Sequence, residues 1–231
     1  MNKLVNCGLE NRFGTNCLKW DGLKSRFGNE NLIAMWVADM DFKAPQPVID
    51  ALKERVNHGI FGYNIIPDSY YEAFINWEKE KHGYNVKKEW IRFSPGVVPA
   101  LFWFINILTN PGDSCIVMGP VYYPFHDAIK ENERKLIFNN LKNDNGIYTI
   151  DFEKFEEDII ENQVKLFILS SPHNPIGRVW TKEELKRVLD ICKANDVFVL
   201  ADDFITLEVD VVDDAAVSFS DLEPHPTSAV E

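Results

Sequence analysis

The stretch that decides the fold is Lys165–Trp180, which reads KLFILSSPHNPIGRVW. Residues 165–169 form a short apolar run of the length expected for a buried β-strand. The loop that follows contains two prolines and a glycine, which restrict its backbone. We expect this loop to present His173, Asn174 and Arg178 to a common region. A rigid polar loop at a strand end is typical of a functional site, although an Asn between prolines is also an ordinary turn former.

Strands and helices alternate on both sides of this stretch. The expected strands are 91–94, 114–118, 135–138, 165–169 and 197–200. The expected helices are 46–57, 68–81, 99–108, 124–132, 152–162 and one that runs from residue 181 to Ala194. This alternation predicts an α/β fold, with a mostly parallel sheet that helices flank.

Local signals mark the ends and faces of several helices. Asp68 is the candidate N-cap of the second helix, and Gly83 is its expected stop. Thr181 and Glu184 have the spacing of a capping box. The 99–108 helix is apolar on every side, so we expect it to be buried.

Other turns at strand ends carry residues suited to binding a ligand, which in a parallel sheet lies at the carboxyl ends of the strands. The turn at residues 94–98 either holds an anion at a helix N-terminus or is a plain strand–helix turn. Tyr122 is placed either to stack on a flat ligand or to join the core. Asp202 ends an apolar strand, and a partly buried carboxylate needs a partner, either a cation on a ligand or an arginine.

Composition and charge narrow the class of protein. The chain has 231 residues, of which 45% are hydrophobic and 26% charged, and its net charge is −12. That charge argues against nucleic-acid binding. The four cysteines are scattered and predict no metal site or disulfide framework. The longest apolar run, 97–108, is far shorter than the ~20 residues that span a bilayer. We therefore expect a cytoplasmic protein without a membrane segment.

The charge is unevenly distributed along the chain. Ten acidic residues and no Lys or Arg follow Lys193. Such an abrupt shift is typical of a solvated or foreign tail. We therefore expect an N-terminal segment at 1–45, a large domain at 46–204 and a divergent acidic tail at 205–231.

Several short motifs, taken in order, resemble one family. They are Gly14-Thr15-Asn16, Lys19-Trp20-Asp21, Met35–Phe42, Phe61-Gly62-Tyr63, Ser94–Pro99 and Pro172–Trp180. They resemble the class I/II aminotransferases of fold type I, which depend on pyridoxal 5′-phosphate (PLP), and within them the cystathionine β-lyase or C–S lyase branch. The resemblance covers about residues 10–204 and implies the large domain of that fold.

The resemblance implies that PLP is the cofactor and assigns roles around its ring. Asn174 would hydrogen-bond the phenolic O3′, Tyr122 would stack on the ring, and Asp202 would pair with the pyridinium nitrogen. A carboxylate beside that nitrogen favours its charged form, in which the ring withdraws electrons.

Further roles concern the phosphate and the substrate. The resemblance implies that the amides of Val97 and Val98, after Gly96, hold the phosphate. It implies that Tyr63 reaches the phosphate in a neighbouring subunit, and hence a homodimer. Val37 and Ala38 would line the substrate side.

The implied reaction is carbon–sulfur β-elimination, which converts an amino acid such as cystathionine or cysteine into pyruvate, ammonia and a thiol. Two alternatives stay open. The protein is otherwise a class I/II aminotransferase, or a non-catalytic regulatory or binding remnant.

The resemblance also implies a Schiff-base lysine a few tens of residues after Asp202, and no lysine follows Lys193. Family members run to nearly twice this length. We therefore expect the fold to be incomplete, without the C-terminal small domain and without two central strands that lie between 91–94 and 197–200. Covalent attachment of PLP is then not possible in this chain, and we expect it to be inactive alone.

Overall fold

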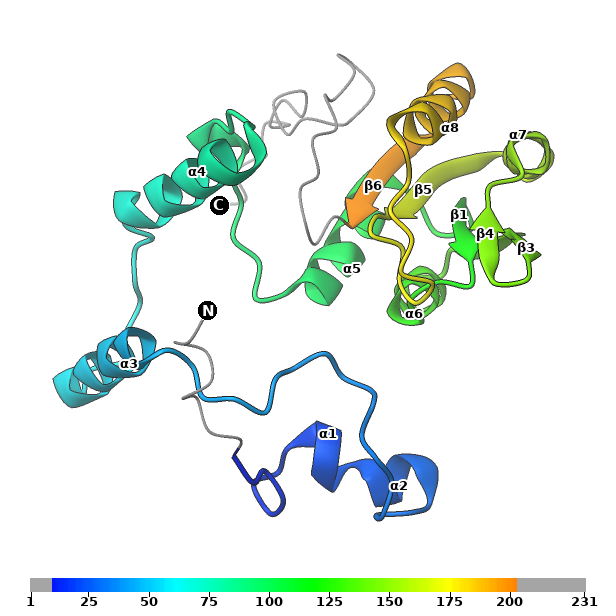
Figure 1. Ribbon diagram of the computed structural model, residues 1–231. Helices are drawn as coiled ribbons and strands as arrows, with labels where there is room; N and C mark the ends of the chain where they lie inside the picture. The colour runs from blue at the N-terminus through cyan, green and yellow to red at the C-terminus, as the bar shows by residue number, and fades with distance from the viewer. Residues whose placement is uncertain (1–9, 203–231) are drawn as a thin grey trace, which may run out of the picture. The chain divides into compact units, whose positions relative to one another are not determined.

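The structure is a computed structural model that describes residues 10–202 (Figure 1). The chain divides into two compact units, Met1–Ile65 and Ile66–Glu231, and each is described by itself. The boundary expected at residue 45 stays a prediction. The expected tail at 205–231 lies outside the described residues.

Within residues 10–65, the N-terminal unit contains the helices α1 (Leu18–Asp21), α2 (Leu23–Phe27) and α3 (Gln46–His58). The prediction of α3 from its apolar spacing is confirmed, and Gly59 ends it with a φ of 73°. The helices α1 and α2 were not expected, because four or five residues are too few to show a helical period. The carboxylate of Asp21 fixes this region by accepting hydrogen bonds from the amides of Gly14 (2.9 Å) and Cys17 (3.1 Å).

The C-terminal unit follows the predicted alternation. Its helices are α4 (Asp68–His82), the 3₁₀ turn η1 (Lys88–Trp90), α5 (Val97–Leu108), α6 (Pro124–Glu131), α7 (Phe152–Glu161) and α8 (Lys182–Ala194). Its strands are β1 (Ser114–Gly119), β2 (Lys135–Asn140), β3 (Lys142–Asp144), β4 (Ile147–Thr149), β5 (Val164–Ser170) and β6 (Phe198–Asp202). The main sheet has the order β2-β1-β5-β6, and every neighbouring pair is parallel.

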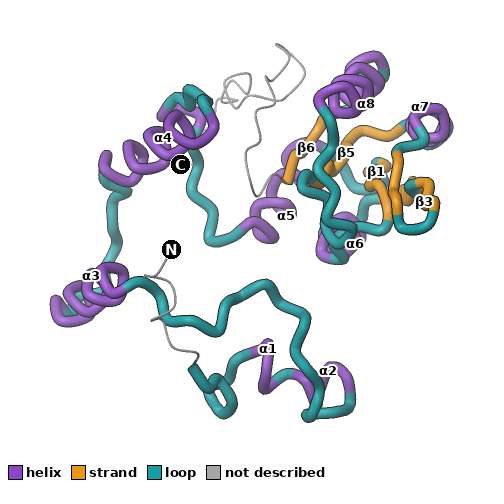
Figure 2. Tube along the Cα trace, in the orientation of Figure 1, coloured by secondary structure: helices purple, strands orange, loops and turns teal. Residues whose placement is uncertain are grey.

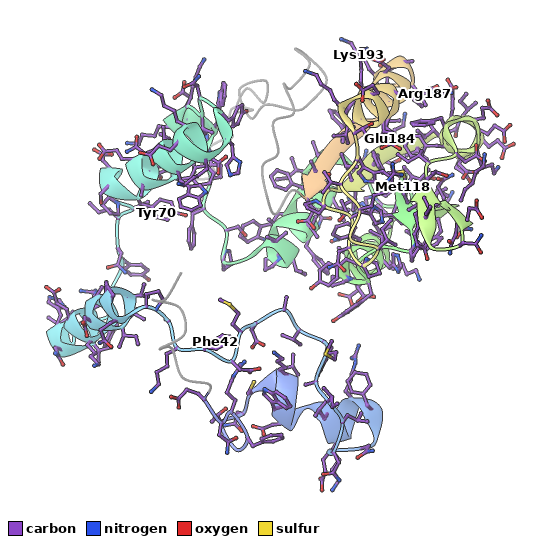
Figure 3. All side chains as sticks on the ribbon, viewed as in Figure 1. Phe42, Tyr70, Met118, Glu184, Arg187 and Lys193 are labelled. Carbon is purple, nitrogen blue, oxygen red and sulfur yellow. The ribbon has the colours of Figure 1, made fainter. Side chains whose placement is uncertain are left out.

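Helices cover both faces of this sheet. Along β1, Cys115 and Val117 belong to a core shared with α5 and α6, whereas Ile116 and Met118 belong to a core shared with α7 and α8. This alternation follows from the pleat, which sends successive side chains to opposite faces. The exposed face of α8 carries charged residues, among them Arg187 (Figure 3). The predicted α/β fold with a parallel sheet and flanking helices is confirmed.

Two local predictions need correction, and one element was not predicted. The strand expected at 91–94 is wrong, because no strand within residues 10–202 pairs with that segment. Asp68 is the first residue of α4 rather than its N-cap, which is Pro67, while Gly83 ends the helix as expected. The antiparallel hairpin of β3 and β4 was missed (Figure 2), although Asn145-Gly146 between them, with φ of 51° and 92°, is a typical hairpin turn.

The apolar helix α5 is only partly buried. Leu101 and Ile105 pack into the core, whereas Trp103 is 49% and Ile107 is 61% exposed. The expectation of a fully buried helix is therefore wrong within the described residues, because β5, β6 and α6 cover only one of its sides. Residues 10–202 contain no helix with the length and apolar character needed to cross a membrane.

Candidate functional site

The strands β5 and β6 end side by side at the carboxyl edge of the sheet (Figure 1). Ser170 and Asp202 occupy paired positions, and the amide of Ser171 donates a 3.3 Å hydrogen bond to the carbonyl oxygen of Asp202. The loop that contains Asn174 therefore begins beside Asp202. This edge is where parallel sheets bind ligands.

Asp202 is a half-buried carboxyl group whose pKa is raised by burial. No salt bridge joins it to a cation within residues 10–202. Its charge also contributes, after burial and Tyr123, to raising the pKa of Tyr122. The predicted ring-stacking residue and the predicted carboxylate therefore lie within range of each other's charge.

Tyr122 lies in the turn between β1 and α6. Its ring meets the rings of Phe125 and Tyr123 edge-on, with centroids 6.0 and 5.5 Å apart. The ring is half-buried. Tyr122 is therefore partly a core residue and partly accessible to a ligand, because one part of its side chain packs on α6 and another part reaches the surface.

The turn before α5 has the geometry of a helix N-terminus. Gly96 is the N-cap, and the hydroxyl of Ser94 donates a 2.7 Å hydrogen bond to its carbonyl oxygen. The amides of Val97 and Val98 belong to the first helical turn, whose N–H groups cannot bond within the helix. A Cβ at Gly96 would meet only Pro99, at 3.5 Å.

The loop after β5 divides the three polar residues that we expected in one region, so that expectation is wrong. His173 is 1% exposed, and its Nε2 lies 2.9 Å from the carbonyl oxygen of Pro120. Arg178 forms a 2.6 Å ion pair with Glu184. Of the three, Asn174 has an exposed side chain, and its backbone amide is held by the Ser170 hydroxyl at 3.3 Å. Packing thus buries the His173 side chain, and the ion pair with Glu184 engages the partly exposed guanidinium of Arg178.

Trp180 is a structural residue of this loop to which we had assigned no role. Its indole N–H donates to the carbonyl oxygen of Ser170 at 3.0 Å, and the Arg178 guanidinium lies 4.6 Å from its ring centroid. The ring of His173 also meets it edge-on, with centroids 5.4 Å apart. In the sequence, the one indication of these contacts is that Trp180 and Arg178 belong to the same short motif.

Val37, Ala38 and Tyr63 belong to the N-terminal unit. Val37 has a φ of 56°, a left-handed conformation that a β-branched residue adopts only under strain. Nearby, the carboxylate of Asp41 accepts hydrogen bonds from three side chains. Its donors are Arg12 at 2.9 Å, Trp20 at 2.9 Å and Lys19 at 3.1 Å. These bonds lower the pKa of Asp41 to about 2 and anchor the irregular segment that carries Val37.

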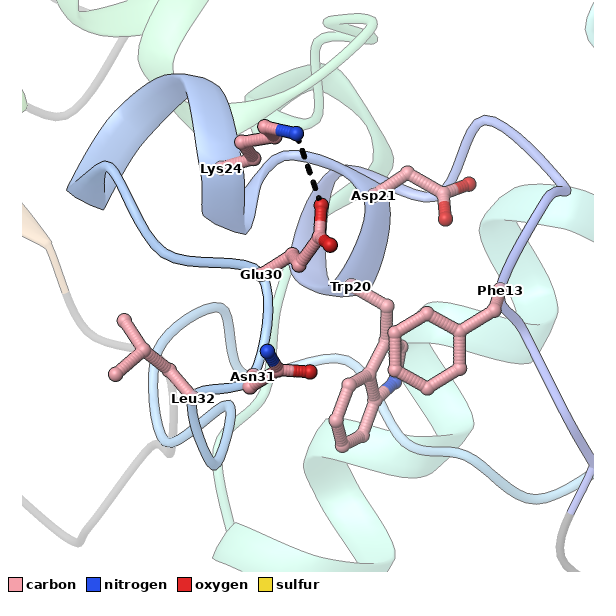
Figure 4. Close-up of a pocket in the computed structure, with 7 residues that line it drawn as sticks. All are labelled: Phe13, Trp20, Asp21, Lys24, Glu30, Asn31 and Leu32. Carbon is pink, nitrogen blue, oxygen red and sulfur yellow. Dashed lines mark ion pairs between the residues drawn. The ribbon is translucent and has the colours of Figure 1, made fainter.

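A surface pocket of about 610 Å³ lies elsewhere in the N-terminal unit (Figure 4). Its lining residues are Phe13, Trp20, Asp21, Lys24, Glu30, Asn31 and Leu32. An exposed ion pair of 3.2 Å joins Lys24 to Glu30 at its rim. No predicted cofactor or substrate residue lines this pocket, so it is not the candidate site. Among the described residues, no group of three or more His, Cys, Asp or Glu side chains is arranged to hold a metal ion.

Comparison with known proteins gives the family. Residues 30–205 match the family model of class I and II aminotransferases. The chain is 43% identical over 194 residues to cystathionine β-lyase PatB of Bacillus subtilis, covering 84% of this chain and 50% of that protein. It is 31% identical to protein MalY of Escherichia coli, covering 83% of this chain and 50% of that protein.

Solved structures agree with this assignment. The PLP-bound C–S lyase of Staphylococcus hominis is 37% identical with a TM-score of 0.77, covering 84% of this chain and 49% of that one. Cystalysin of Treponema denticola, whose structure contains PLP, is 37% identical with a TM-score of 0.77, covering 84% and 50%. The chain thus spans about half the length of the relatives it matches, and it corresponds to their N-terminal portion.

The residues at the sheet edge fit the cofactor that these relatives bind. Asp202 is a carboxylate without a cationic partner among residues 10–202. Its charge acts on Tyr122, and the first-turn amides of α5 have no partner within the helix. A flat, phosphorylated, cationic ring needs these three kinds of group. The chain belongs to the class I and II aminotransferase family of PLP-dependent enzymes, and within it is similar to the cystathionine β-lyase branch.

Proposed function

We propose that this chain supplies the cofactor-binding part of a PLP-dependent carbon–sulfur β-lyase. The substrate is an amino acid with a β-thiol or β-thioether, such as cysteine or cystathionine, and the products are pyruvate, ammonia and a thiol. The observation that carries the proposal is the position of Asp202. It is a partly buried carboxylate at the end of β6 whose charge acts on Tyr122, with a pKa that burial raises and no ion pair to a cation among residues 10–202.

Asp202 is the residue that holds the cofactor's ring nitrogen in its protonated form. When bound, PLP withdraws electrons from the substrate's α-carbon, and this capacity depends on that proton. An unpaired carboxylate at a half-buried position is unfavourable, and a cationic N–H placed against it removes that cost. Pairing of the protonated ring nitrogen with Asp202 therefore both stabilises the buried carboxylate and keeps the cofactor in the form that its chemistry requires.

The other cofactor contacts follow from the same edge of the sheet. Tyr122 stacks on the ring, and the exposed amide of Asn174 donates a hydrogen bond to the O3′ oxygen. The first-turn amides of Val97 and Val98, which follow Gly96, bind the phosphate. Asn174 is exposed, Tyr122 is half-buried, and the amides of Val97 and Val98 have no intrahelical partner.

Further roles are proposed for Val37, Ala38 and Tyr63. Val37 and Ala38 line the space that the substrate occupies, and the fully exposed Tyr63 reaches the phosphate bound to a second copy of the chain, in a homodimer. The left-handed backbone at Val37 is consistent with a functional role, because strained backbone is common at ligand sites.

Residues 1–231 by themselves are proposed to be inactive. The resemblance assigns the general base for the α-proton to a lysine that follows Asp202, and this sequence has no lysine after Lys193. Without that amine, PLP has no lysine to which it can be attached covalently. The proton on the substrate's α-carbon also has no general base to accept it. Binding of PLP without turnover is the expected behaviour.

The binding test compares two aspartate variants in the full chain. Asp202→Asn is expected to weaken PLP binding by about 10- to 100-fold, the effect of losing a hydrogen bond to a charged group. Asp196→Asn, in the exposed turn before β6, is the matched control and should bind as the unmodified chain does. Binding is measured by quenching of tryptophan fluorescence. Equal affinity of the two variants would contradict the role of Asp202.

The activity test separates the lyase from its alternatives. The chain with PLP is expected to release no pyruvate from cystathionine. Residues 1–202 joined to the remaining part of the Bacillus subtilis relative should release it, and Asp202→Asn in that chimaera should abolish release. Transfer of the amino group to a 2-oxo acid without pyruvate release would instead favour an aminotransferase. PLP binding with neither reaction would favour a regulatory or binding role.

A further inference from the structure

His173 joins two loops that leave neighbouring strands of the sheet. It lies in the loop after β5, and its Nε2 is 2.9 Å from the carbonyl oxygen of Pro120, in the loop after β1. The strands β1 and β5 pair directly. The bond from His173 to Pro120 therefore connects the two loops that follow their carboxyl ends. The His173 side chain is 1% exposed.

The tautomer of His173 follows from its partner. A carbonyl oxygen only accepts, so the proton is on Nε2 and Nε2 donates. The second nitrogen, Nδ1, is buried and has no hydrogen-bond partner among the described residues. A buried polar atom without a partner is unfavourable, and an apolar ring would fill the same space without that cost. The largest contribution specific to histidine at this position is therefore the bond to Pro120, with smaller effects from the carbonyl oxygens of Ser170 and Met118.

The imidazole is fixed on its own side as well as at Pro120. The backbone amide of His173 donates to the carbonyl oxygen of Arg178 at 2.7 Å, and its carbonyl oxygen accepts from the amide of Gly177 at 2.7 Å. The ring meets Trp180 edge-on at an interplanar angle of 83°, and Trp180 in turn bonds to Ser170. Because the imidazole is held rigidly, its bond to Pro120 fixes the loop after β1 relative to the loop after β5.

The two loops carry different parts of the candidate site. Pro120 lies two residues before Tyr122, and His173 lies directly before Asn174. We propose that His173 is a positioning residue that fixes Tyr122 and Asn174 relative to each other, so that one can stack on the cofactor ring while the other reaches its O3′ oxygen. This role rests on the proposed function, since it concerns the two side chains assigned there to the cofactor.

Without this link, each loop is positioned through its own strand end and its own local bonds. Stacking and hydrogen bonding to one rigid ring must both be satisfied at once, and supporting residues of this kind set how closely that geometry is held. Loss of the link is expected to loosen residues 119–125 even when no cofactor is present.

The test uses the full chain with three substitutions at one position. His173→Gln places an amide N–H near the Nε2 position and should retain the bond. His173→Asn is one methylene shorter, and His173→Phe fills the space without a donor, so both should lose it. Val188→Ala, in the core on the α8 side of the sheet, is the control for a general loss of stability.

Two measurements are made on each variant. Hydrogen exchange of residues 119–125 in the cofactor-free chain should rise about tenfold in the Asn and Phe variants and little in the Gln variant, as expected for one lost hydrogen bond. The dissociation constant for PLP should rise in the same order. The Gln–Asn comparison remains informative if the Phe variant does not fold.

The outcomes separate this role from the proposed function. If Gln behaves like Asn, or if Val188→Ala loosens residues 119–125 equally, His173 only fills space and the inference is overturned. If the unmodified chain binds no PLP but the exchange pattern is as expected, the link stands as a structural finding and the proposed function fails. Unchanged exchange in every variant would overturn the link whatever the cofactor affinity.

Discussion

The guanidinium of Arg134 donates two hydrogen bonds to Thr109, one to its hydroxyl at 2.9 Å and one to its carbonyl oxygen at 2.5 Å. Thr109 is the C-cap of α5, the helix whose first turn carries the proposed phosphate-binding amides. Arg134 is 7% exposed and also bonds to Asn106 and to the carbonyl oxygen of Asn132. One buried cation thus joins the ends of α5 and α6.

Replacement of Arg134 by methionine is expected to destabilise the C-terminal unit by about 2–4 kcal/mol, because it leaves several buried acceptors without a donor. The measurement is urea unfolding followed by circular dichroism. Lys130→Met, at an exposed position on α6, should change the free energy of unfolding by less than about 0.5 kcal/mol. Equal effects of the two substitutions would show that the Arg134 bonds contribute no net stability.

Asp41 is expected to make the N-terminal unit sensitive to acid. Hydrogen bonds from Trp20, Lys19 and Arg12 lower its pKa in the folded chain to about 2, from an ordinary 3.8. Because the folded pKa is the lower one, this contribution is present above about pH 4 and is lost as the pH falls toward about 2. Asp41→Asn should remove it, whereas Asp50→Asn on α3 should not. Unfolding of the N-terminal unit at a series of pH values tests this expectation.

His173 is expected to give the C-terminal unit a second dependence on pH. Burial lowers its folded pKa below 6.5, although the carbonyl oxygens of Pro120, Ser170 and Met118 oppose this change. The unfolded chain then binds more protons, so stability falls as the pH drops below about 6.5 and levels off below the folded pKa.

His173→Gln should remove this component of the pH dependence. His126, whose pKa is also lowered mainly by burial, titrates in the same direction, so it is the difference between the two chains that reports on His173. The measurement is the midpoint of urea unfolding at several pH values. Identical pH dependence in both chains would show that His173 is not held neutral by the fold.

Val37→Gly is expected to stabilise the N-terminal unit by roughly 1 kcal/mol. The φ of 56° costs a β-branched residue more than the extra backbone entropy that glycine loses on folding. Val48→Gly, at an exposed position in α3, should instead destabilise by about 1 kcal/mol. The comparison is made by thermal unfolding. If both substitutions destabilise equally, Val37 carries no strain.

The sequence predicted most helices and strands of the C-terminal unit, but not which of them pack together or which side chains stay exposed. The strands β1 and β5 were evident because a buried strand in a parallel sheet is apolar along its length. The capping box of Thr181 and Glu184 was evident because both partners lie within one turn. The absence of a strand at 91–94 and the exposure of Trp103 depend on which elements pack against them, and no local pattern carries that information.

The candidate site divides in the same way. The sequence by itself determined the kinds of residue at the strand ends, the family they resemble and the order of the helices and strands, because these depend on spacing along the chain. Only the tertiary structure decided that Asp202 lies near Tyr122, that Arg178 turns toward Glu184, and that His173 is buried against Pro120. These pairings join residues from separate elements, and their energy depends on burial and distance, which exist only once the sheet has assembled.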